Sequence, residues 1–217
     1  MGFAAFFEHF SGFEFFLLPN LVHARPSATL RRRKPLGSPL RELCVSKMKE
    51  CVMEISVRKA TAEDYNSLCE LFDEIDALHR DNLPHIFQKP SSVAREQDYY
   101  LGLVADENVA LFVSEVGEKL VGFVHAMIRD TPAFPIFVPR RYAIVDGIVV
   151  KSGFQNHGTG KILMDKMQEW AIARGATSIE LNVYEFNVTA ISFYERLGYQ
   201  TFSRKMSKEL KKDKTAG

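Results

Sequence analysis

Two glycines separated by one residue, Gly158 and Gly160, lie in a short polar loop between a predicted strand and a predicted helix. The strand, residues 142–150, is rich in β-branched side chains, and apolar residues recur at helical spacing after Gly160. The N-terminus of a helix offers unpaired backbone N–H groups and the positive end of the helix dipole, which together bind anions. Glycines in the loop would let a phosphate approach those N–H groups, because no side chain stands in the way. The spacing therefore predicts phosphate binding.

Two common phosphate-binding patterns do not fit this loop. The P-loop pattern requires lysine directly after the second glycine, but Thr159 follows Gly158. Lys161 is followed by Ile162, which lacks the hydroxyl that would bind magnesium. The dinucleotide fingerprint requires a third glycine at the position of Leu163. A nucleotide-binding protein is therefore not favoured.

The pattern that fits is Gln155-x-x-Gly158-x-Gly160, which resembles the acetyl-CoA pyrophosphate loop of the GCN5-related N-acetyltransferases (GNAT). A second stretch is similar to the family's other signature: Asn187-x-x-Ala190, Phe193-Tyr194 and Leu197-Gly198-Tyr199. The two patterns occur in the family's order and spacing. The resemblance covers about residues 54–210 and departs at Gln155, where arginine is commoner, and at Asp146, where glutamate is commoner.

The resemblance implies the acetyl-CoA N-acyltransferase fold, a mixed α/β sheet with elements in the order β-α-α-β-β-β-α-β-α-β. Hydrophobic periodicity agrees with this order. We expect strands over 54–59, 109–116, 120–128, 142–150, 178–184 and 199–207, and helices over 61–83, 91–105, 160–174 and 188–197. The first helix should begin with a capping box formed by Thr61 and Asp64.

Residues 1–52 differ in composition from the rest, with seven phenylalanines among the first 16 residues and a basic run at 31–34. An organelle transit peptide is one interpretation. We favour another, in which translation starts at Met48 or Met53 and the preceding segment is upstream sequence. We therefore expect an N-terminal extension over 1–52, an N-acetyltransferase domain over 53–210 and a charged tail over 211–217.

The resemblance also implies how acetyl-CoA would be held. The pyrophosphate would contact the backbone of the loop Gln155, Asn156, His157, Gly158, Thr159, Gly160 and Lys161. The pantetheine arm would enter a gap between strands 142–150 and 178–184 and pair with the backbone of Ile148, Val149 and Val150. A backbone N–H near Val149 or Val150 would polarise the thioester carbonyl. Asn187 would bond the pantetheine amides, although asparagine also favours a helix N-cap there.

Two side chains are the candidate catalytic groups. The resemblance places Tyr194 beside the leaving sulfur, whereas its helical spacing alone would fit core packing. Asp146 alternates with Ile144, Ile148 and Val150, so we expect it to share their face, and the resemblance suggests it as the general base. No cysteine or serine stands at a defined position of either motif, since Ser192 falls at a variable one, so direct attack by the acceptor is expected.

Composition sets the remaining expectations. The formal net charge of +1 gives no reason to expect nucleic acid as a partner, and no apolar run is long enough to span a membrane. Three cysteines without a pairing pattern favour a reducing compartment, which we take to be the cytoplasm. Three histidines lack metal-ligand spacing, so no metal is expected: His79, His85 and His125.

The sequence thus predicts an enzyme that transfers the acetyl group of acetyl-CoA to a primary amine of a small molecule or peptide. The alternative is a non-catalytic acyl-CoA-binding sensor. Such a sensor would keep the loop at 155–160 but would not need Tyr194, which this chain retains. The acceptor cannot be identified from the sequence, and a homodimer is left open.

Overall fold

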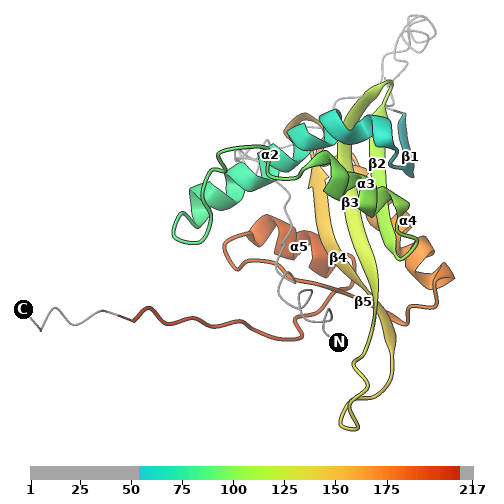
Figure 1. The fold of residues 1–217 in the computed structure, drawn as a ribbon, viewed down its shortest axis with the longest axis vertical. Helices are drawn as coiled ribbons and strands as arrows, with labels where there is room; N and C mark the ends of the chain where they lie inside the picture. Colours follow the sequence, from blue (N-terminus) through green and yellow to red (C-terminus); the bar gives the residue numbers. More distant parts are fainter. Residues whose placement is uncertain (1–53, 211–217) are drawn as a thin grey trace, which may run out of the picture.

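A five-stranded sheet runs through the domain formed by residues 54–210, which are the residues that the computed structural model describes (Figure 1). The strand order follows the sequence: β1 (Ile55–Lys59), β2 (Val109–Val116), β3 (Lys119–Asp130), β4 (Arg141–Val150) and β5 (Ser178–Leu181). Strands β1 to β4 pair antiparallel, whereas β5 pairs parallel to β4. The mixed sheet predicted from the sequence is confirmed.

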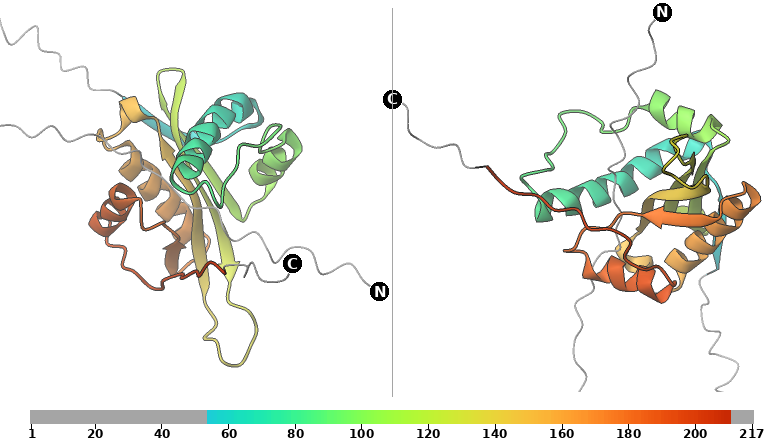
Figure 2. Two further views of the ribbon diagram at one scale, coloured as in Figure 1. Left: turned by 90° about the vertical axis from the view of Figure 1, so that its left-hand side faces the viewer. Right: turned by 90° about the horizontal axis from the view of Figure 1, so that it is seen from below.

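Helices cover both faces of the sheet, as the side-on view in Figure 2 shows. Helices α2 (Tyr65–Asn82) and α3 (Gln97–Ala105) lie on one face, and α4 (Thr159–Ala173) and α5 (Val188–Arg196) on the other. Short 3-10 turns, η1 (Ala62–Asp64) and η2 (Ser152–Phe154), precede α2 and the loop before α4. Each layer of helices has its own buried cluster against the sheet. We call these the α4-side core and the α2-side core.

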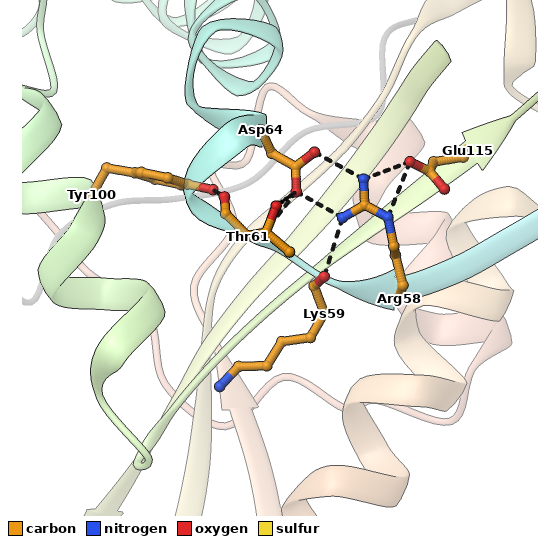
Figure 3. Close-up of polar contacts among 6 residues, drawn as sticks. All are labelled: Arg58, Lys59, Thr61, Asp64, Tyr100 and Glu115. Atoms are coloured by element: carbon orange, nitrogen blue, oxygen red, sulfur yellow. Dashed lines mark hydrogen bonds and ion pairs between the residues drawn. The ribbon is translucent and has the colours of Figure 1, made fainter. Parts of the chain in front are cut away.

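An ionic cluster around Arg58 joins the start of α2 to the sheet (Figure 3). The Arg58 guanidinium donates to both oxygens of Asp64, at 2.7 and 2.8 Å, and to Glu115 on β2 at 2.6 Å. Asp64 also accepts from the backbone N–H of Thr61, which confirms the predicted capping box. The Tyr100 hydroxyl of α3 donates to the Thr61 carbonyl. This cluster therefore joins both α2-side helices to strands β1 and β2.

The loop between β3 and β4, residues 131–140, projects beyond the sheet (Figure 1). It was predicted as a loop, and its tip exposes four large apolar side chains: Phe134, Ile136, Phe137 and Val138. The base of this hairpin is closed by the Arg141–Asp130 ion pair, with a nitrogen–oxygen distance of 2.8 Å. The projection thus carries apolar surface away from the core.

Three predicted elements differ from the structure. The second helix begins at Gln97 rather than at residue 91, because Glu96 has an extended backbone (φ −66°, ψ 153°) that starts the helix there. Strand β5 ends at Leu181, before the predicted end at 184. The strand predicted over 199–207 is absent: residues 199–210 have no regular structure and are exposed from Thr201 onward. Alternation shows that a segment is able to form a strand, but the strand also requires a partner edge.

The extended segment begins beside a groove. This groove has a volume of about 430 Å³ and lies between the C-terminal part of α4, strand β5 and residues 197–200. From Thr201 onward the chain no longer lines it. The predictions for residues 1–52 and for the tail at 211–217 lie outside the described residues.

Candidate functional site

Strands β4 and β5 separate part-way along their length. Their pairing runs from Tyr142 opposite Ser178 to Val145 opposite Leu181, where β5 ends. Strand β4 continues for five more residues, and β3 alone pairs with it there. The edge of β4 from Asp146 to Val150 that faces away from β3 is therefore not covered by a strand of the described chain.

The directions of the backbone N–H and carbonyl groups of β4 determine which residues can form hydrogen bonds at this uncovered edge. The Lys151 N–H donates to the Val121 carbonyl on β3, and the Val149 carbonyl also points towards β3, at Gly122. Because successive residues of a strand direct their backbone groups to opposite sides, Val150 faces the uncovered edge. The Val150 carbonyl there accepts a hydrogen bond of 2.8 Å from the Gln155 side chain. Of the two residues considered for a thioester contact, Val150 thus has the suitable direction.

A tight loop leads from β4 into α4. Its backbone enters the left-handed region twice, at Asn156 (φ 62°) and at Gly158 (φ 85°). The Thr159 hydroxyl donates to the Phe154 carbonyl at 3.0 Å and is buried. The side chains of Asn156, His157 and Lys161 are exposed. The buried side chains of Gln155 and Thr159 therefore stabilise the loop through hydrogen bonds to the backbone, whereas the side chains between them are exposed.

The N-terminus of α4 has the features of an anion site. Gly158 is the N-cap residue and provides no side-chain cap. Ile162 donates to the Gly158 carbonyl at 3.0 Å, which closes the first helical turn. The N–H groups of Thr159, Gly160 and Lys161 precede that bond, so they have no acceptor within the helix. A Cβ atom on Gly158 would meet nothing within 4 Å, so its backbone conformation rather than crowding requires glycine.

Gly160 has a role that the sequence did not predict. A Cβ atom there would lie 3.3 Å from the Phe193 ring of α5 and 3.9 Å from the Val150 side chain. The residue is buried. We had expected this glycine to clear space for a phosphate, but its open side faces the protein interior. Its absent side chain leaves room for the Phe193 ring of α5 against the start of α4.

Asn187 caps α5. Its side-chain oxygen accepts a hydrogen bond of 3.0 Å from the Ala190 N–H, and its own N–H donates to the Tyr184 carbonyl at 2.9 Å. The helix-cap interpretation is confirmed. Contact with a pantetheine amide stays a prediction.

Tyr194 is 3% exposed and lies between two rings, with centroids 5.4 Å away at Phe193 and 5.7 Å away at Tyr199. Its hydroxyl is buried, and none of residues 54–210 provides it with a hydrogen-bond partner. Burial, followed by the influence of Tyr199, raises the pKa of Tyr194. Buried hydroxyls are ordinarily paired, so an unpaired one at this position fits a group that is completed by a ligand.

Asp146 occupies a β-bulge. On β3, His125 pairs with Gly147 and Ala126 pairs with Val145, so Asp146 is the extra residue between them. The bulge reverses the alternation: Ile148 and Val150 belong to the α4-side core, and only Val149 joins the α2-side core. The prediction that Asp146 shares a face with Ile148 and Val150 was therefore wrong.

The bulge places Asp146 next to His125 on the α2 side of the sheet. The His125 Nδ1 and Asp146 Oδ2 atoms are 3.3 Å apart, and the two side chains are 8% and 17% exposed. The Asp146 charge is also close enough to Tyr99 of α3 to be, after burial, the second cause that raises the pKa of Tyr99. Sequence reasoning set His125 aside, because only the register of β3 against β4 brings it to Asp146.

Comparison with protein families agrees with this geometry. The model of the acetyltransferase (GNAT) family matches residues 72–199, which include both sequence motifs. The chain belongs to the GNAT family. The predicted family resemblance is confirmed.

Relatives of this GNAT chain include uncharacterised and characterised enzymes. An uncharacterised N-acetyltransferase of Methanocaldococcus jannaschii is 31% identical over 145 residues, 67% of this chain and 60% of that protein. The L-ornithine N5-acetyltransferase of Arabidopsis thaliana is 31% identical over 71 residues, 33% of this chain and 31% of that protein. The matches thus span about 60% and about a third of the lengths of these two relatives.

Solved structures show the same fold. A protein of Bacillus halodurans, solved as a tetramutant, superposes with a TM-score of 0.68 at 23% identity, covering 71% of this chain and 99% of that one. The glucosamine-6-phosphate N-acetyltransferase of Arabidopsis thaliana superposes with a TM-score of 0.54 at 17% identity, covering 73% and 99%. The GNAT fold predicted from the sequence is confirmed, although the final strand is absent here.

The predicted site residues of this GNAT chain divide between the two faces of the sheet. The α4 loop, the uncovered edge of β4 and Tyr194 lie on or beside the α4-side core, whereas Asp146 lies across the sheet. Within residues 54–210, no cluster of three or more potential metal ligands is present. No helix in that range combines the length and apolar composition that a membrane span requires.

Proposed function

We propose that this GNAT protein transfers the acetyl group of acetyl-CoA to a primary amine. The observation that carries the proposal is the buried hydroxyl of Tyr194, which has no hydrogen-bond partner among residues 54–210 and lies in the same core as Val150 at the uncovered edge. The α4 N-terminus would hold the pyrophosphate through its backbone N–H groups. The Val150 N–H would bind the thioester carbonyl oxygen, and the Tyr194 hydroxyl would bind the departing sulfur.

The reaction is a direct displacement. The neutral amine attacks the thioester carbonyl carbon, the carbon–sulfur bond breaks, and the products are an amide and the thiol of CoA. The proton lost by the amine nitrogen passes to Asp146 directly or through water, and the leaving thiolate takes up a proton. A lysine-like amine with a pKa of about 10.4 is neutral in only about one molecule in a few thousand at pH 7. A positioned base is therefore useful, typically by about 10²–10⁴-fold.

The acceptor class is an amine, and amino acids with a side-chain amine come first among the candidates. The ornithine acetyltransferase of Arabidopsis thaliana is similar to part of this chain, which supports that order of testing. We place the enzyme in the cytoplasm, because its three cysteines suit a reducing compartment.

A panel of primary amines, followed by release of free CoA, tests this proposal. We expect acetyl-CoA binding by calorimetry and amine-dependent CoA release that Asp146→Asn lowers by roughly 10²-fold or more. Binding of acetyl-CoA with no CoA release from any amine would favour the sensor alternative. Absence of acetyl-CoA binding would refute both.

A further inference from the structure

The candidate base Asp146 contacts His125, a largely buried side chain that has no role in the function proposed so far. Asp146 is the bulged residue of β4, and His125 of β3 is the cation-forming side chain in contact with it. No lysine or arginine in residues 54–210 forms an ion pair with Asp146. A carboxylate that is mostly removed from water requires a partner that compensates its charge. Among the described residues, His125 is the side chain that contacts the Asp146 carboxylate in this way.

We propose that His125 is a positioning residue, which donates its Nδ1–H to one oxygen of Asp146 and directs the other oxygen towards the acceptor amine. This inference rests on the proposed function, because it assigns a task to the base of that reaction. It adds a residue that belongs to neither of the two sequence motifs.

The direction of the hydrogen bond follows from the chemistry of the two groups. An ionised carboxylate only accepts hydrogen bonds, and a neutral imidazole carries a single N–H. The contact at Nδ1 is attractive only if that nitrogen carries the proton. The other ring nitrogen, Nε2, is buried and has no partner among the described residues, so no competing acceptor holds the proton there. The separation of 3.3 Å is slightly longer than an ordinary N–H···O hydrogen bond.

Exposure distinguishes the tasks of the two side chains. Asp146 is 17% exposed and His125 is 8% exposed, so the carboxylate is the more accessible of the pair. The neighbouring Val145 belongs to the α4-side core, so by alternation the Asp146 carboxylate lies on the α2 side of the sheet. His125 pairs across the strands with Gly147, which has no side chain to push the imidazole away. The imidazole of β3 thus contacts the carboxylate of the neighbouring strand β4 from its more buried side.

Two nearly isosteric substitutions separate positioning from packing. His125→Asn keeps an amide N–H at the position of Nδ1, whereas His125→Gln moves the amide to the position of Nε2. We expect His125→Gln to lower kcat by roughly 10-fold with little change in KM for acetyl-CoA, because it disturbs part of a general-base contribution of about 10²–10⁴. His125→Asn should stay within about threefold of the wild type. Equal losses in both variants would overturn the proposal.

A double-mutant cycle tests whether His125 acts through Asp146. In the Asp146→Asn background, His125→Gln should have no further effect on kcat, since the base that it positions is gone. Multiplied losses in the double variant would instead show that His125 acts independently, and they would overturn the proposal. Melting temperatures of all variants control for loss of folding.

The state of the imidazole gives a test that needs no activity. Nitrogen NMR of the histidine-labelled, substrate-free protein should show the His125 proton on Nδ1 at neutral pH, and Asp146→Asn should shift that signal. An unprotonated Nδ1 would overturn the proposal whatever the kinetics give. A wild-type protein that binds no acetyl-CoA or releases no CoA would refute the proposed function instead, which keeps the two failures distinct.

Discussion

Replacing Tyr194 by phenylalanine should raise stability and lower activity together. The substitution keeps the ring between Phe193 and Tyr199 and deletes a hydroxyl that is buried without a partner in the described chain. An unsatisfied buried polar group costs about 1–3 kcal/mol. If about 1 kcal/mol of this is regained, the melting temperature of the substrate-free protein should rise by about 2–4 °C.

The loss of activity follows from the acidity of the two groups. A thiol resembling that of CoA has a pKa of about 8.5 and free tyrosine one of about 10, so full proton transfer to the thiolate is uphill by about 2 kcal/mol. Burial raises the pKa of Tyr194, so it makes this transfer more difficult. Tyr194 should therefore act as a hydrogen-bond donor to the developing charge on sulfur, which is a weak acceptor. Its removal should lower kcat roughly 10–100-fold.

Single-turnover kinetics and thermal unfolding measure the two effects separately. Tyr199→Phe is the matched control: it removes a hydroxyl from the neighbouring ring and should leave kcat unchanged. If Tyr194→Phe has the kcat of the wild type under conditions where chemistry limits turnover, Tyr194 contributes only to packing. A melting temperature that falls would show that its hydroxyl is satisfied in the free protein.

Two further predictions concern the loop and the ionic cluster. Gly158→Val forces a β-branched residue into φ 85°. It should therefore weaken acetyl-CoA binding at least 10-fold, measured by calorimetry, and lower the free energy of unfolding by roughly 1–2 kcal/mol. The control is Gly153→Ala, where a Cβ meets nothing within 4 Å, and it should change neither binding nor stability. Hydrogen bonding from Arg58 lowers the pKa of Asp64, so the bonded carboxylate stabilises the fold above about pH 4 and this contribution is lost as pH falls through its folded pKa. Denaturant unfolding should therefore find Asp64→Asn less stable than the wild type at pH 7 and nearly equal at about pH 2, and a gap that persists in acid would contradict this assignment.

Local signals in the sequence were sufficient for most of the fold. The strand, loop and helix over 141–173 follow from β-branched residues, two glycines and helical spacing. The capping box of Thr61 and Asp64 and the cap at Asn187 are likewise set by residues within one turn. Such features depend on neighbours three or four positions away, which a single sequence displays.

The differences arose where distant segments decide the outcome. The bulge at Asp146 is a property of the register between β3 and β4, and strict alternation along one strand cannot reveal it. The Gln155 bond to the Val150 carbonyl and the contact of Gly160 with Phe193 require the folded loop and the packed helices. The strand expected over 199–207 is absent for the same reason: alternation is a local property of the sequence, whereas a strand also needs a partner strand from a distant part of the chain.

The close approach at Gly160 has a consequence for ligand size. Helix α4 follows the loop at 155–158, and at Gly160 it leaves room for the Phe193 ring, whose neighbour in α5 is Tyr194. If acetyl-CoA binds as proposed, the span between its pyrophosphate and its sulfur depends on how Phe193 of α5 packs against Gly160 of α4. A loop that shifts cannot lengthen this span while the helices remain in contact. If the proposed function is correct, we therefore expect the packing of α5 against α4, more than the loop, to determine which length of arm between phosphate and sulfur the protein accepts.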